Sequence, residues 1–102
     1  MLLTIDIGNT ETTAGLFDDE VLRAHWRLTT TAMRTADEMR VLLTQLVAAE
    51  GIAAESVTGV ALCSVVPTVT QSAVDACDFA FRVTPVVVDA RSALPISLDV
   101  DE

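Results

Sequence analysis

The first seventeen residues constrain the fold most strongly, because they join two strand patterns through one tight polar turn. The segment Leu2–Ile7 is apolar apart from Thr4 and Asp6, and the turn Gly8-Asn9-Thr10 follows it directly. A second strand pattern, about Thr12–Phe17, begins with two threonines. A strand, a glycine turn and another strand in this order predict an antiparallel hairpin with its polar side chains gathered at one end.

This turn has a composition that suits a phosphate chain. A glycine such as Gly8 lets backbone N–H groups approach an anion closely, and the neighbouring threonines and Asn9 add side-chain donors. Asp6 repels phosphate, but it can hold Mg²⁺ or its water shell, and the metal then neutralises the phosphates. The same spacing is also common in hairpin turns that bind nothing, so the spacing alone leaves both interpretations open.

Length and composition favour one folded domain. The chain has 102 residues, of which 51% are hydrophobic and 21% are charged, and this is enough for one domain with its own core. No apolar run reaches the roughly 18–20 residues that a membrane span needs. No basic segment precedes the first apolar run, as a secretion signal requires. We therefore expect a cytoplasmic protein without a membrane partner.

The charge of the chain limits its partners. The formal net charge is −9, and all six basic residues are arginines, with no lysine. Such a chain repels nucleic acid, so we expect no nucleic-acid partner. The lack of lysine also excludes a phosphate loop of the G-x-x-x-x-G-K-[ST] type. An anionic ligand must therefore arrive with a cation that offsets its charge.

The rest of the pattern predicts a strand, a helix, a strand, a helix and a strand. Leu22, Ala24, Trp26 and Leu28 alternate with polar residues, which is typical of a strand with one covered face. Thr35 and Glu38 have the spacing of a capping box at a helix start. The expected elements are a strand over Val21–Leu28, a helix from Thr35 to Gly51, a strand over Val57–Val66, a helix opened by Pro67 and a strand over Val83–Val88.

This order of elements defines a fold class. A three-strand meander followed by an α-β-α-β unit predicts an α/β domain, with a mixed five-stranded sheet and helices packed on it. Pro85 near the start of the last strand argues for an edge position, because proline cannot donate to a neighbouring strand. We expect residues 90–102 to be a segment that leads out of the domain.

Four short motifs occur in a fixed order over nearly all of the chain. They are Asp6-Ile7-Gly8-Asn9-Thr10, Ala24-His25-Trp26-Arg27-Leu28, Arg34-Thr35-Ala36-Asp37-Glu38 and Ser64-Val65-Val66-Pro67, with Leu94-Pro95-Ile96 near the exit. Together they resemble the type III pantothenate kinases, a family of the acetate and sugar kinase, heat-shock chaperone ATPase and actin superfamily. The resemblance implies a ribonuclease-H-like domain. It also implies that residues 1–102 are the N-terminal domain of a two-domain kinase, whose C-terminal half is absent.

The resemblance further implies an activity and a site. The activity is the ATP-dependent phosphorylation of pantothenate to 4'-phosphopantothenate, the first step toward coenzyme A, with ATP, Mg²⁺, a monovalent cation (K⁺ or NH₄⁺) and a homodimer. Asp6 holds Mg²⁺ through water in this interpretation. The residues that bind the nucleotide are Asp6, Ile7, Gly8, Asn9, Thr10, Glu11, Thr12 and Thr13, and those beside pantothenate are Val65, Val66 and Val100.

Some features depart from the family pattern. The family's catalytic base is an aspartate in a Gly-Ala-Asp-Arg motif, which this sequence does not contain, so we expect the chain to be inactive alone. Glu11 places a carboxylate beside the phosphates, and Val100 falls near a position where relatives often have tyrosine. A non-catalytic regulatory or interaction module on the same fold is the alternative.

Overall fold

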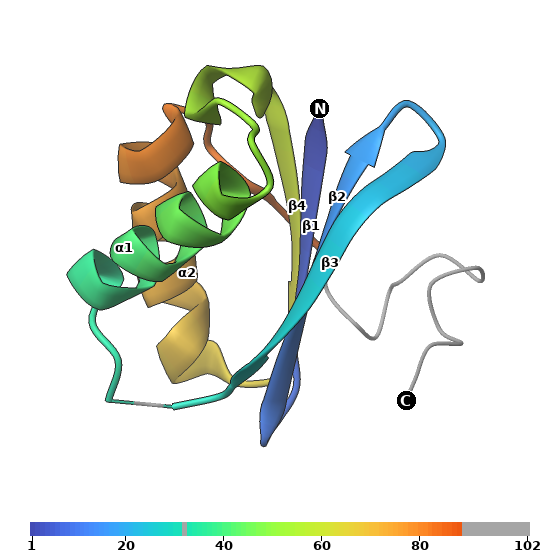
Figure 1. Ribbon diagram of the computed structural model, residues 1–102. Coiled ribbons are helices and arrows are strands. Elements are labelled where there is room, and N and C mark those ends of the chain that lie inside the picture. The colour runs from blue at the N-terminus through green and yellow to red at the C-terminus, as the bar shows by residue number, and fades with distance from the viewer. Residues whose placement is uncertain (32, 89–102) are drawn as a thin grey trace.

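The computed structural model describes residues 1–31 and 33–88, which form one sheet covered by two helices. Both helices lie on the same face of the sheet (Figure 1). The elements are β1 (Leu2–Ile7), β2 (Glu11–Asp18), β3 (Val21–Thr29), α1 (Ala36–Ala49), the short 3₁₀ turn η1 (Ala54–Ser56), β4 (Gly59–Ser64), α2 (Pro67–Phe81) and β5 (Val86–Val88).

The sheet has five strands in the order β3-β2-β1-β4-β5. β1, β2 and β3 pair antiparallel, whereas β4 pairs parallel with β1 and with β5. This confirms the expected α/β domain, in which a meander is followed by two helical crossovers, and it confirms the edge position of the last strand. Because β1, β4 and β5 are parallel, their carboxyl ends meet at one edge of the sheet.

The core lies between the sheet and the two helices. On β1 every second residue points into it, and Thr4 and Asp6 alternate with them on the opposite face. This alternation follows from the strand period of two. No helix in the described part of the chain is long and apolar enough to cross a membrane. The core side chains on the sheet include Leu3, Ile5, Ile7, Leu16 and Leu62, and those on the helices include Met39, Leu43, Val47, Val69, Ala73, Ala76 and Phe81.

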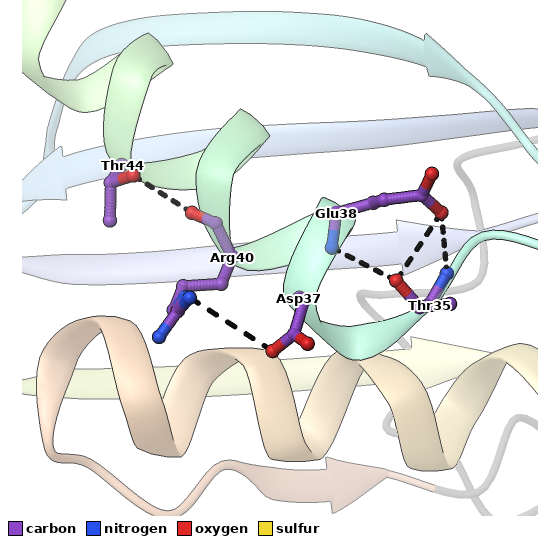
Figure 2. A network of polar contacts seen from close by, with 5 residues as sticks. All are labelled: Thr35, Asp37, Glu38, Arg40 and Thr44. Atoms are coloured by element: carbon purple, nitrogen blue, oxygen red, sulfur yellow. Dashed lines mark hydrogen bonds and ion pairs between the residues drawn. The ribbon is translucent and has the colours of Figure 1, made fainter.

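The helix α1 begins with a capping box, which Figure 2 shows. The Glu38 N–H donates to the Thr35 hydroxyl at 3.1 Å, and the Thr35 N–H donates to the Glu38 carboxylate at 2.8 Å. Two N–H groups that the helix itself leaves without acceptors are thereby satisfied. The helix ends just before Gly51, whose φ of +76° lies in the left-handed region that favours glycine. Both predicted helix boundaries are therefore confirmed.

Replacing Thr35 with alanine should lower the free energy of unfolding by about 1 kcal/mol, because the cap at the start of α1 is lost. Urea unfolding followed by the fluorescence of Trp26 measures this change. Gln45→Ala on the exposed side of the same helix is the control, and it should be neutral within about 0.5 kcal/mol. Equal stability of Thr35→Ala and the parent chain would contradict the role of the capping box.

Two strands are shorter than their apolar patterns suggest. The run Val57–Val66 yields the strand Gly59–Ser64, because η1 ends next to it and Val66 becomes the N-cap of α2. Val57 is still buried, so its apolar character serves the core outside the strand. The last strand covers Val86–Val88, and the expected start at Val83 is wrong. Apolar composition alone therefore does not mark where a strand begins or ends.

The expected alternation of the third strand fails at one position. The pairing of β2 with β3 shifts by one residue between Leu16 and Phe17, so that Leu22 pairs with Phe17. A bulge of this kind reverses the face to which the next side chain points. Leu22 accordingly lies beside Gly15 on the face opposite the helices and is 48% exposed, while Ala24 stays on the covered face.

Candidate phosphate-binding site

The turn between β1 and β2 is closed by a backbone hydrogen bond. The Gly8 N–H donates to the Glu11 carbonyl at 3.0 Å. A Cβ atom at Gly8 would lie 3.0 Å from that same oxygen, so a side chain there would push this backbone oxygen away by a few tenths of an ångström. Asn9 and Thr10, the two residues between them, are exposed. The turn thus depends on glycine and presents its polar residues to solvent.

Asp6 and Thr13 are neighbours on the face of the sheet opposite the helices. They are paired in register across β1 and β2, and both are exposed. Side chains paired in this way point to the same side, with Cβ atoms about 5 Å apart. The carboxylate of Asp6 therefore reaches solvent next to a hydroxyl and close to the turn. An acceptor that can hold a hydrated cation and a donor for an anion therefore lie side by side.

Ile7 and Thr12 lie on the other face, against the helices. Ile7 is fully buried, and its carbonyl accepts the Val65 N–H at 3.1 Å, which ties the end of β1 to the segment after β4. Thr12 is only 4% exposed, and its hydroxyl shares a hydrogen bond of 2.8 Å with the hydroxyl of Thr30. Ile7 and Thr12 thus support the turn on the face that the helices cover, whereas Asp6 and Thr13 lie on the opposite face.

The carboxylate of Glu11 is engaged by a cation. Its oxygen lies 3.6 Å from the Arg27 guanidinium on β3, and both side chains are more than half exposed. An exposed pair of this kind contributes little to stability. It does offset part of the negative charge that Glu11 brings to the turn. The sequence shows both residues but gives no sign of their pairing.

The segment between β4 and α2 holds two of the residues expected beside pantothenate. Val65 is 52% exposed, whereas Val66 packs against the core. The Ser64 hydroxyl accepts the Val66 N–H at 3.0 Å and fixes this corner. Val100, the third expected residue, lies outside the described residues. Beside the corner is an open hollow of about 370 Å³, lined by Ser64, Pro67, Thr70, Gln71, Val87 and Val88.

The described residues contain no group of three or more histidine, cysteine or acidic side chains that could hold a metal. A single exposed carboxylate such as Asp6 fits Mg²⁺ nonetheless, since this ion keeps several waters and is usually held by one or two carboxylates together with substrate phosphates. The donor set thus suits a metal that arrives with its nucleotide.

The two cysteines differ in their surroundings. Cys77 is fully buried in α2, and this burial, with a smaller contribution from the charge of Asp78, raises the pKa of its thiol to about 12. The thiol is therefore protonated at neutral pH and acts as a core side chain. Cys63 stands beside Asp6 in the register of β1 and β4 and is half-buried. No disulfide joins the two within the described residues.

Two solved structures that share this architecture are named as kinases. The ROK hexokinase from Thermus thermophilus superposes on 87% of this chain and 35% of its own chain, with a TM-score of 0.64 and 13% sequence identity. A putative N-acetylglucosamine kinase from Porphyromonas gingivalis covers 87% of this chain and 34% of its own, with a TM-score of 0.62 and 18% identity. The chain therefore has the fold of a domain found in ROK-type kinases.

Sequence comparison narrows this class to one family. The family model for type III pantothenate kinase matches residues 2–102, and the chain belongs to that family. The type III pantothenate kinase of Roseiflexus sp. strain RS-1 is 45% identical over 101 residues, which are 99% of this chain and 40% of that protein. Type III pantothenate kinase 2 of Symbiobacterium thermophilum is 46% identical over 101 residues, which are 97% and 38%. The chain thus spans about two fifths of the length of these relatives.

Proposed function

We propose that this chain supplies the first phosphate-binding turn of an enzyme that transfers the γ-phosphoryl group of ATP to pantothenate and so forms 4'-phosphopantothenate. The observation that carries the proposal is the group of exposed polar residues Asp6, Asn9, Thr10 and Thr13 around the Gly8 turn, at the carboxyl end of β1. Membership of the type III pantothenate kinase family supports the choice of reaction.

In this proposal, these residues position the phosphates of ATP and help to neutralise their charge. Phosphoryl transfer needs little covalent help from the protein, and the phosphates must be held in line with the acceptor hydroxyl. Asn9, Thr10 and Thr13 would donate to phosphate oxygens, and Asp6 would hold Mg²⁺ through its water shell. Mg²⁺, when bound, neutralises the phosphate charge. Ile7 and Thr12 would support the turn from the covered face.

The rest of the site belongs to parts of the protein that this chain does not include. In our proposal, residues 1–102 are the N-terminal domain of a two-domain kinase, and the catalytic aspartate comes from the other domain. We therefore expect the chain alone to bind nucleotide without turnover. The monovalent cation (K⁺ or NH₄⁺), the homodimer and the cytoplasmic location belong to the same proposal and are supported by family membership.

Calorimetric titration of the chain with a non-hydrolysable ATP analogue tests the proposal. We expect binding in the presence of Mg²⁺, and we expect a much weaker but measurable binding when the metal is removed with EDTA. Adenosine, which lacks the phosphates, should not bind. With the analogue at ten times its dissociation constant, the stabilisation is about 1.4 kcal/mol, which should raise the melting temperature by roughly 6 °C.

Two results would contradict the proposal. If the analogue produces neither heat nor a thermal shift, the chain does not offer a nucleotide site, and the alternative of a regulatory or interaction module gains support. If adenosine binds as well as the analogue, the site does not recognise phosphates. Rapid phosphorylation of pantothenate by the chain alone would contradict only the expectation that it is inactive.

A further inference from the structure

The phosphate-binding turn is fastened to the segment that follows β3. The Thr30 N–H donates to the Thr10 carbonyl at 2.9 Å, and the Thr30 hydroxyl shares its 2.8 Å hydrogen bond with Thr12. The first contact holds the turn itself, and the second holds the first residues of β2. Thr30 therefore contacts the hairpin on both sides of Glu11.

The pairing of the two hydroxyls is costly to disturb. Thr12 is 4% exposed, and a buried hydroxyl that loses its partner keeps the full cost of its removal from water. The Thr30 side chain is only partly buried, so it has less to lose. Loss of this hydrogen bond should therefore cost more free energy at the buried Thr12 hydroxyl of the hairpin than at the partly buried Thr30 hydroxyl.

The same segment is also fastened at its other end. The Arg34 guanidinium donates to the Thr29 carbonyl at 3.2 Å, and Thr35 caps α1. Thr29, the residue before Thr30, is therefore linked to Arg34, which directly precedes the N-cap of α1. A turn that binds an anion gains affinity when its conformation is already held before the ligand arrives.

We propose that Thr30 is a positioning residue for the phosphate-binding turn: through Thr12 and through the Thr10 carbonyl it holds Gly8–Thr10 in the conformation that accepts the phosphates. Thr30 itself faces the hairpin and does not belong to the ligand contacts proposed above. This inference rests on the proposed function for the identity of the ligand, but the effect of Thr30 on the turn can be measured without any ligand.

Native-state amide exchange of the Thr30→Val chain gives the first measurement. We expect the amide of Gly8 and the amide at position 30 to exchange roughly threefold to tenfold faster than in the parent chain, which corresponds to one lost hydrogen bond. Thr44→Val is the matched control, because its hydroxyl also makes a 2.8 Å hydrogen bond, which it donates to the Arg40 carbonyl within α1. It should leave both turn amides unchanged. Unchanged turn amides in Thr30→Val would overturn the inference.

Titration with the Mg²⁺-bound ATP analogue gives the second measurement. Thr30→Val should weaken binding roughly threefold to tenfold, and Thr44→Val should not change it. The double variant Thr12→Val/Thr30→Val removes both hydroxyls, so it should be more stable than Thr30→Val while its binding stays weak. If Thr30 acted only by stabilising the fold, the double variant would regain binding together with stability. That result would overturn the inference.

The two proposals can fail separately. If the parent chain binds no analogue, the proposed function fails, and the amide exchange alone decides whether Thr30 holds the turn. If the parent chain binds and Thr30→Val loosens the turn without weakening the binding, the proposed function stands and the positioning role is overturned.

Discussion

Replacing Leu62 with alanine should lower the free energy of unfolding by about 3 kcal/mol, the largest stability effect that we expect from one substitution in this chain. Leu62 is fully buried on β4, in register with Ile5 of β1, and packs in the core cluster that includes the helix side chains. The substitution loses the transfer free energy of the removed atoms and leaves a cavity that a strand held on both sides closes poorly. The melting temperature of a domain of this size should fall by roughly 12 °C or more.

Leu22→Ala is the control for this experiment. It removes the same atoms from a side chain that is 48% exposed, on the face opposite the helices. Its cost should stay below about 1 kcal/mol. Urea unfolding followed by the fluorescence of Trp26 measures both variants. Similar costs for the two variants would contradict the placement of the core between sheet and helices.

The fold could be predicted from the sequence because its strongest local signals agree with each other. The alternation in Leu2–Ile7, the capping box at Thr35 and the glycine at position 51 each point to the element that the structure contains. These signals depend only on neighbouring residues, so no knowledge of long-range contacts is needed. The order of strands and helices then leaves few possible sheet topologies.

The errors occur where pairing between strands decides the outcome. The bulge between Leu16 and Phe17 turns Leu22 to the other face, and the sequence of β3 carries no signal for it, since the extra residue looks like part of the alternation. Val57 and Val83 were expected in strands because they are apolar, but the neighbouring strands do not extend far enough to pair with them. Register is a property of two segments, and one segment cannot reveal it.

The candidate site was predicted only in part for the same reason. The sequence indicates that a carboxylate, a glycine and several hydroxyls lie near one turn. It does not say which face each side chain takes once Ile7 and Thr12 turn toward the core. The contacts of Thr12 with Thr30 and of Glu11 with Arg27 join segments that are 18 and 16 residues apart, and no motif marks either pair.

The largest effect on ligand binding should come from Asp6→Asn. The substitution keeps the shape of an exposed side chain and removes its charge. If Asp6 holds the water shell of Mg²⁺, affinity for the Mg²⁺-bound ATP analogue should fall about tenfold or more, as expected for the loss of a charged hydrogen-bonding partner. Affinity for the metal-free analogue should stay the same or rise, because a negative charge beside the phosphates is gone. Titration of the analogue with Mg²⁺ and with EDTA measures both.

Asp19→Asn is the matched control for the charge. Asp19 sits in the β2–β3 turn with a φ of +56°, a conformation that asparagine also adopts, and β2 separates it from the phosphate-binding turn by about 25 Å. At that distance the charge is screened, so this variant should bind like the parent chain. A loss of affinity that occurs only with Mg²⁺ is what distinguishes a metal-holding carboxylate from one that merely shapes the turn. A carboxylate that shapes the turn would weaken both forms of the ligand equally, and that result would remove Asp6 from the proposed site.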